Sequence, residues 1–215
     1  MSTSEPSPTL VLGVVGGIAS GKSYVARALA GTDGMLIDAD RIAHEVLASP
    51  EGAAFCRERF GERRPDVLGP DSLPSRQVLA ELCFDPRDGE ANRRALEGWI
   101  HPRVRERIRA SSSAARRAGL RVLVLDVPLL LENNSQHGLA DACDRIVFVD
   151  ADEQVRDARA RATRGWTAGE LARREAAQLP LAEKRRRADH VLSNHGTLED
   201  LDRKIAALRA ELGLG

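Results

Sequence analysis

Aromatic side chains are scarce in this chain of 215 residues, of which they make up 3%. Apolar residues reach 42%, so a hydrophobic core is possible, but it must be built from Leu, Val, Ile and Ala. Net charge is absent, because 32 acidic residues balance 32 basic ones, and this argues against a general nucleic-acid binder. No apolar run reaches 18 residues, so we expect no membrane span.

Cysteine is also rare. The three cysteines, Cys56, Cys83 and Cys143, are far apart and lack metal-ligand spacing, which suits a reducing cytoplasm. The five histidines are scattered in the same way. Residues 1–8 have neither a basic start nor an apolar stretch, so they predict a short disordered tail rather than a signal peptide.

Lysine is the rarest of the cations, since only Lys22, Lys184 and Lys204 occur among 32 basic residues. One of them lies in the most informative stretch of the chain. Residues 16–23 read Gly-Gly-Ile-Ala-Ser-Gly-Lys-Ser and fit G-x-x-x-x-G-K-[ST], the pattern of the phosphate-binding loop. Where arginine is the usual cation, a lysine at the required position indicates a need for a compact ammonium group.

In such a loop the backbone N–H groups point at phosphate oxygens, the lysine reaches the β- and γ-phosphates, and the serine hydroxyl ligates Mg²⁺. We therefore expect an ATP site in which Lys22 is catalytic and Ser23 holds Mg²⁺. The residues expected around ATP are Gly17, Ile18, Ala19, Ser20, Gly21, Lys22, Ser23 and Tyr24.

Strand-like and helix-like segments alternate over much of the chain. The loop follows an apolar run at 9–15 and precedes a helical stretch at 24–30, the context in which the motif is meaningful. Continuous apolar runs, typical of strands covered on both faces, recur at 34–38, 120–126, 144–150 and 190–193. The expected fold class is α/β, a three-layer parallel sheet of the P-loop NTPase type. This nucleotide-binding core would comprise residues 9–40 and 119–215.

Two helical regions stand apart from this alternation. Residues 41–118 contain no strand candidate and predict a helical insertion that binds the second substrate, with its longest helix starting at His101-Pro102. Residues 152–188 are helical and rich in arginine. They form either a solvated surface or a mobile lid, at about 152–180, that brings arginine over the transferred phosphoryl group.

Three aspartates follow the second and third predicted strands. Asp38 and Asp40 come at the end of one and Asp126 ends the other, so all are expected at the sheet edge where open parallel sheets bind ligands. Asp38 has the alternative role of capping the next helix, which makes Asp40 the better candidate for a general base. Asp126 resembles an aspartate that holds Mg²⁺ through water, and Val127 after it, in place of Glu, favours transfer to a bound hydroxyl over hydrolysis.

The nucleotide base is expected near Asn194, which follows the last predicted strand. A guanine site would need an Asn-Lys-x-Asp run, and the chain has none. Adenine is therefore the expected base.

The chain resembles the dephospho-coenzyme A kinase family over residues 10–202, because several motifs of that family occur here in the same order. Besides the phosphate-binding loop, they are Ile37-Asp-Ala-Asp40, Phe84-Asp-Pro86, Ile100-His-Pro102, Val127-Pro-Leu-Leu-Leu-Glu132, Ala176-Ala-Gln178 and Ala188-Asp-His-Val-Leu-Ser-Asn194. The resemblance implies transfer of the γ-phosphate of ATP to the 3′-hydroxyl of dephospho-coenzyme A with Mg²⁺, the last step of coenzyme A synthesis. It also implies a nucleotide-binding core, a helical acceptor-binding domain and a lid.

The resemblance further implies roles for single residues. Asp40 matches the catalytic base, Arg159 matches a lid arginine that contacts the phosphates, and His101 matches the acceptor domain. The acceptor-binding residues expected are Asp38, Asp40, His101, Pro128 and Leu129. The partners would be ATP and dephospho-coenzyme A, without nucleic acid or membrane, and the protein would be a monomer, with an oligomer left open.

Three departures from the family pattern are visible. Family members usually have Gly at position 19, and Ala19 fits the loop if its φ is negative. They usually have Thr at position 24, so Tyr24 removes a hydroxyl contact beside the α-phosphate. The usual lid sequence is Arg-Asp-Gly, whereas residues 163–165 read Thr-Arg-Gly, which displaces the second lid arginine by one position.

Two other functions stay open at this point. One is a different P-loop small-molecule kinase, acting on a nucleoside or nucleotide. The other is an ATP-binding regulatory or nucleic-acid-associated module that uses the basic run 184–187, although such a run more commonly faces solvent on a helix.

Overall fold

The computed structural model describes residues 9–214, so the expected tail at 1–8 lies outside the described residues. The described chain forms two compact units. The first comprises the residues up to Asp38 and those from Ser111 onward, and the second comprises Ala39–Ala110.

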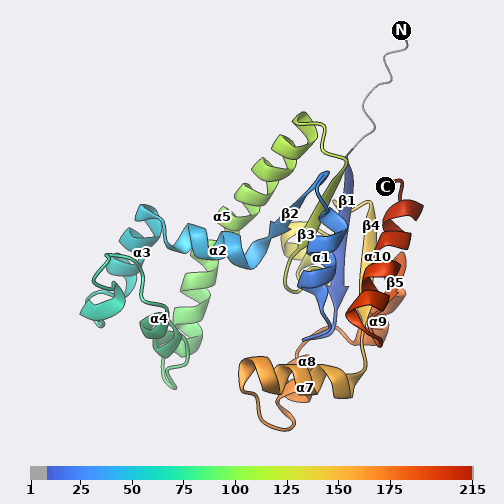
Figure 1. Cartoon of the computed structure of the whole chain (residues 1–215). Coiled ribbons are helices and arrows are strands. Elements are labelled where there is room, and N and C mark those ends of the chain that lie inside the picture. The colour runs from blue at the N-terminus through green and yellow to red at the C-terminus, as the bar shows by residue number, and fades with distance from the viewer. Residues whose placement is uncertain (1–8, 215) are drawn as a thin grey trace. The chain divides into compact units, whose positions relative to one another are not determined.

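A parallel sheet of five strands forms the centre of the first unit, with the strand order β2-β3-β1-β4-β5 (Figure 1). The strands are β1 (Leu10–Gly16), β2 (Gly34–Asp38), β3 (Val122–Asp126), β4 (Arg145–Asp150) and β5 (His190–Ser193). All strand pairs are parallel, which confirms the expected fold class. Because β1 is the central strand, the loop that follows it leaves the middle of the edge where the carboxyl ends of the strands meet.

Helices cover one face of this sheet. Alternate strand residues such as Leu12 and Val147 pack there against α1 (Lys22–Ala30) and α10 (Leu198–Glu211) in one buried cluster. Thr197 fixes the start of α10 through a capping box with Asp200.

The segment between β3 and β4, which includes α6 (Asn134–His137), packs against β1 at Gly13. A Cβ added to Gly13 of β1 would lie 2.8 Å from Leu130 and 2.9 Å from Cys143 of this segment. The remaining helices of the unit are α7 (Glu153–Arg164), α8 (Glu170–Glu175) and α9 (Leu181–Arg186), of which α9 contacts β1.

The second unit is helical over its described length. It contains α2 (Ala39–Leu47), α3 (Pro50–Phe60), the 3₁₀ turn η1 (Pro65–Val67), α4 (Arg76–Cys83) and most of α5 (Gly89–Arg117). Its core cluster consists of Cys56, Phe60, Val67, Val78, Leu79 and Leu82. Beside that cluster the Trp99 ring of α5 stacks on Phe55, with 4.9 Å between ring centroids.

The start of the longest helix is a correction to the sequence analysis. We expected it at His101-Pro102, but α5 begins at Gly89 and contains Pro102 in its interior. Proline lacks the N–H that would bond to the Gly98 carbonyl and is common at the first position of a helix, so the sequence predicts a helix start there. Buried residues of α5 on both sides of Pro102, such as Asn92 before it and Ile108 after it, account for the helix continuing through it.

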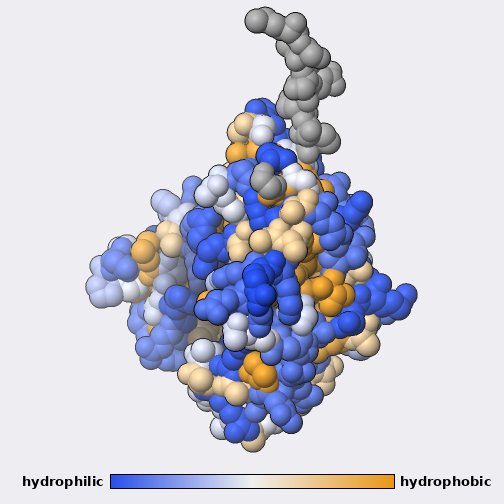
Figure 2. Space-filling view, turned by 45° about the vertical axis from the view of Figure 1, so that its right-hand side comes forward, coloured by the Kyte–Doolittle hydropathy of each residue, from blue (hydrophilic) through white to orange (hydrophobic). Residues whose placement is uncertain are grey.

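The surface is mostly hydrophilic, and the visible hydrophobic residues form scattered spots (Figure 2). Within residues 9–214, no helix combines the length and the apolar character that a membrane crossing requires. All three cysteines are free thiols.

Candidate functional site

The loop of residues 16–23 connects β1 to α1 and ends in an unusual helix start. Gly21 is the N-cap residue, has φ 96°, and provides no side chain to cap the first turn of α1. A Cβ at Gly21 would lie 2.7 Å from Asn194 Nδ2, so both conformation and space require glycine here. Since the first turn of α1 also lacks acidic residues, its N–H groups and helix dipole are available to an anion.

Ala19 does not meet the condition under which alanine fits this loop without strain. That condition is a negative φ, whereas its φ is 58°, in the left-handed region that favours glycine. An alanine there brings its Cβ close to the backbone and costs about 1–2 kcal/mol. The conformation of Ala19 therefore lowers the stability of the folded protein. Such strained residues are typical of functional sites.

Lys22 folds back over its own loop. Its Nζ donates to the carbonyl of Gly17 at 2.7 Å and to that of Gly16 at 3.3 Å. The pKa of Lys22 is lowered from 10.5 to about 8, and burial is the main cause. The charge of Asp126 opposes this shift, whereas the positive charges of Lys184 and Arg164 contribute to it. A compact ammonium group is thus held at the loop in an environment that disfavours its charge.

Two carboxylates end the neighbouring strands β2 and β3. Asp38 and Asp126 are direct partners in the register of β2 and β3, and both end their strands. Asp126 is close enough to Lys22 to oppose the fall in its pKa. Carboxylate and hydroxyl oxygens are ligands that Mg²⁺ accepts together with waters and phosphate oxygens, so Asp126 and Ser23 are the residues that could hold it. No group of three acidic, His or Cys side chains within 9–214 forms a metal site from protein alone.

A residue that follows β5 forms a hydrogen bond with the backbone of the loop. Asn194 is buried, and its Nδ2 donates to the carbonyl of Ser20 at 2.8 Å. The adjacent His195 contacts Asp152 through Nδ1 at 2.8 Å and Asp150 through Nε2 at 3.5 Å. The hydrogen bond to Asp152 is the main cause that raises the pKa of His195 above 6.5. The sequence placed Asn194 near the base, and the structure uses its amide to fix the loop backbone.

Tyr24 also contacts an element distant in sequence. Its hydroxyl donates to Asp202 of α10 at 2.6 Å, and the residue is exposed. The side chain therefore links α1 to α10.

The arginines of the expected lid lie on α7 and α8. Arg159 on α7 brings its Nη1 to 4.0 Å from the position that a Cβ on Gly21 would occupy. Arg164 and Arg174 lie over the Trp166 ring, at 5.1 and 4.6 Å from its centroid. Arg159 is thus beside the phosphate-binding loop, while the displaced Arg164 packs on an aromatic ring.

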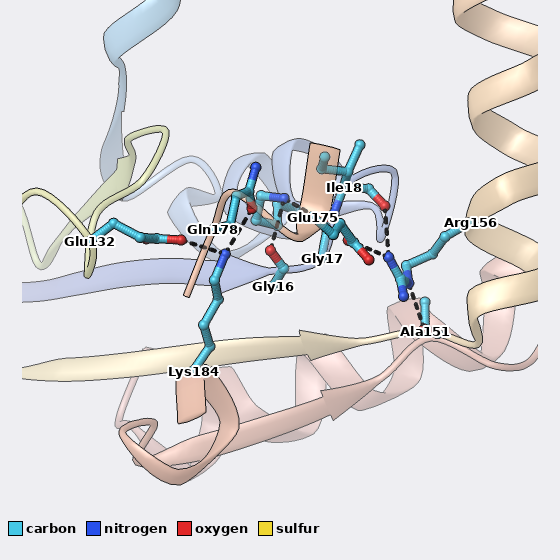
Figure 3. A network of polar contacts seen from close by, with 10 residues as sticks. Gly16, Gly17, Ile18, Glu132, Ala151, Arg156, Glu175, Gln178 and Lys184 are labelled. Atoms are coloured by element: carbon cyan, nitrogen blue, oxygen red, sulfur yellow. Dashed lines mark hydrogen bonds and ion pairs between the residues drawn. The ribbon is translucent and has the colours of Figure 1, made fainter. Parts of the chain in front are cut away.

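The basic run 184–187 departs from our expectation at one residue. Arg185, Arg186 and Arg187 are exposed, as expected, but the Lys184 side chain is only 5% exposed. Its Nζ contacts Glu132 Oε1 at 2.7 Å and donates to Gln178 Oε1 at 3.0 Å (Figure 3). A buried charge requires such partners. Glu132 and Gln178 belong to motifs of the sequence analysis that had no assigned role, and here both contact Lys184. A cavity of about 300 Å³ lies nearby, lined by Glu175, Ala176, Gln178, Leu179, Pro180 and Leu181.

The expected acceptor-binding residues occur in both units. Pro128 and Leu129 are exposed in the segment after β3, and Leu129 has φ 53°, an uncommon conformation for a bulky residue. Asp40 is exposed in the first turn of α2, and His101 is exposed on α5, both in the second unit.

One pair of residues next to the loop escaped the sequence analysis. Arg156 and Glu175 both contact Ile18 (Figure 3). Glu175 was not singled out, and Arg156 was only one of several arginines of the expected lid. They lie far from the loop in sequence, so a local pattern could not reveal them.

The family model for dephospho-CoA kinase matches residues 10–200 of this chain. The chain belongs to the dephospho-CoA kinase family. Among curated members, the protein named dephospho-CoA kinase from Geobacillus kaustophilus is 36% identical over 93% of this chain and 95% of its own length. That from Streptomyces avermitilis is 39% identical over 94% of each chain.

Solved structures share the fold of this chain. A crystal structure named TT1252 from Thermus thermophilus matches with a TM-score of 0.72 and 33% identity, covering 95% of this chain and 98% of that one. Dephospho-CoA kinase from Campylobacter jejuni, at 21% identity and a TM-score of 0.68, shares the fold over 95% of this chain and 97% of its own.

The strain at Ala19 yields a stability prediction. We expect Ala19→Gly to raise the free energy of unfolding by about 0.5–1 kcal/mol, because glycine adopts positive φ without a Cβ clash and loses only part of this gain in unfolded-state entropy. Urea unfolding measures the effect. Ala19→Ser keeps the Cβ and should show no gain, and a less stable Ala19→Gly protein would contradict the strain.

The depressed pKa of Lys22 yields a prediction about pH. The unfolded lysine binds a proton up to about pH 10.5 and the folded one only up to about pH 8. Between these values the unfolded state holds more protons, so folding stability rises with pH. Relative to Lys22→Met, the wild type should gain about 2 kcal/mol of unfolding free energy between pH 7 and 10. Parallel stability curves of the two proteins would show that Lys22 titrates normally.

Proposed function

We propose that this protein transfers the γ-phosphate of ATP to the 3′-hydroxyl of dephospho-coenzyme A, the final step of coenzyme A biosynthesis, in the cytoplasm. The observation that carries the proposal is the phosphate-binding loop, with Lys22 folded over it, at the carboxyl edge of the sheet in a chain of this family. Val127 after Asp126, where a hydrolase would often have Glu, also favours transfer to a bound hydroxyl.

The phosphates of ATP would lie against the loop N–H groups and the first turn of α1, with Lys22 at the β- and γ-phosphates. Ser23 and Asp126 would hold Mg²⁺, which supplies charge neutralisation at the phosphate oxygens when bound. Arg159, beside Gly21, would stabilise the charge that develops during transfer. The adenine would lie near Asn194, whose amide also fixes the Ser20 carbonyl.

Asp40 would accept the proton of the attacking 3′-hydroxyl. Residues 41–118 would form the acceptor-binding domain and residues about 152–180 the lid. The acceptor would contact Asp38, Asp40, His101, Pro128 and Leu129.

The direct test is a reaction with ATP, Mg²⁺ and dephospho-coenzyme A, with the product identified by mass. We expect the acceptor to gain one phosphate. Nucleosides and nucleoside monophosphates serve as control acceptors, and faster phosphorylation of one of them would identify a different small-molecule kinase.

Asp40 is tested by Asp40→Asn, which removes the proton acceptor and keeps the shape of the side chain. We expect kcat to fall on the order of 10²–10⁴-fold, the typical contribution of a general base. Asp71→Asn, which changes an exposed loop carboxylate of the same unit, should retain kcat. Near-normal turnover by Asp40→Asn would assign the base to another residue.

A further inference from the structure

A buried arginine lies directly behind the phosphate-binding loop. The Arg156 side chain on α7 is 4% exposed. Its Nε donates to the carbonyl of Ala151 at 3.0 Å, and its Nη1 donates to Glu175 Oε1 at 2.5 Å. The same Nη1 approaches the carbonyl of Ile18 at 3.4 Å. A guanidinium removed from water requires a charged partner, and Glu175 at the end of α8 is that partner.

Glu175 also contacts the loop. Its Oε1 accepts a hydrogen bond from the backbone N–H of Ile18 at 2.8 Å, while the side chain as a whole is 17% exposed. Figure 3 shows the Glu175 carboxylate between Ile18 and Arg156. One carboxylate oxygen of Glu175 therefore links the Ile18 N–H to the Arg156 guanidinium. Side chains from α7 and α8 thus both contact the loop at Ile18.

Gly17 provides an independent indication of how closely these groups fit. A Cβ added at Gly17 would lie 2.7 Å from Arg156 Nη1 and 3.0 Å from Glu175 Oε1. Distances this short force a shift in a neighbour, and here the neighbours are two mutually bonded groups, of which Arg156 is buried. The glycine at this position is thus required by the pair behind it, and the loop and the pair are matched in shape.

We propose that Arg156 and Glu175 form a clamp that positions the first turn of the phosphate-binding loop and thereby sets its affinity for ATP. The inference rests on the proposed function only in taking ATP as the ligand of this loop. Both are positioning residues, because they act on the loop backbone rather than on a substrate. N–H donors stabilise phosphate well only when the backbone that carries them is fixed before binding.

An ion pair that only stabilises the fold would behave differently. Its loss would lower the melting temperature and the fraction of active protein, while the remaining folded molecules would bind ATP as before. A clamp on the loop predicts a change in ATP affinity itself, with little change in the KM for the acceptor. This distinction defines the experiment.

The test compares Glu175→Ala with Glu175→Gln in the full chain, measuring the dissociation constant of Mg²⁺-ATP by titration calorimetry and both KM values in the kinase assay. Glu175→Ala leaves the Ile18 N–H without its acceptor, so we expect ATP affinity to fall about tenfold, as for one hydrogen bond to a charged group. Glu175→Gln keeps an oxygen that accepts this bond and should recover most of the affinity. The KM for the acceptor should stay within about twofold.

Glu183→Ala is the matched control, because Glu183 also pairs with two arginines, Arg186 and Arg187, but does not touch the loop. It should bind ATP like the wild type. If Glu175→Ala does not fold, Arg156→Lys tests the clamp instead, since an ammonium group cannot reproduce the planar contacts, and ATP affinity should again fall.

The outcomes are separable. Unchanged ATP affinity in Glu175→Ala and Arg156→Lys, or equal losses in Glu175→Ala and Glu175→Gln, would overturn the clamp. Because calorimetry follows ATP alone, a wild type that binds ATP without phosphorylating dephospho-coenzyme A would contradict the proposed acceptor and leave the clamp to be judged on its own result.

Discussion

A phosphate-binding loop must hold its backbone in one conformation although it belongs to neither a strand nor a helix, and the first unit is arranged around that constraint. Backbone groups of the loop are fixed by side chains from three places in the chain. Glu175 of α8 accepts a hydrogen bond from the Ile18 N–H. Asn194, after β5, donates to the Ser20 carbonyl, and Lys22 of α1 donates to the Gly17 carbonyl. The central position of β1 in the sheet makes this possible, because α1, α8 and the end of β5 can all reach its carboxyl edge.

Part of this arrangement could be predicted from the sequence. The strands of the sheet and residues 16–23 could, because apolar runs and glycine spacing are local signals. The contacts of Arg156 and Glu175 could not, since these residues lie more than a hundred positions from the loop and their charges are those of any surface helix. Lys184 was misjudged for the same reason, because only the fold shows that Glu132 provides a buried partner.

Two features of the loop act against stability. Ala19 holds a conformation suited to glycine, and Lys22 keeps an ammonium where burial disfavours it. Both are expected where a backbone and a charge are arranged for a ligand rather than for packing. Of the three lysines in the chain, Lys184 lies close enough to Lys22 for its charge to contribute to the lowered pKa of Lys22, so two of these rare cations are near the loop.

The register of β2 and β3 places the carboxylates of Asp38 and Asp126 on the same rung at the end of their strands. Like charges directly opposite one another on neighbouring strands are destabilising when both groups are ionised. A divalent cation bound there would relieve the repulsion in the folded chain alone. Folding and cation binding are then linked equilibria, and the measured stability of this fold becomes a function of the free cation concentration around it.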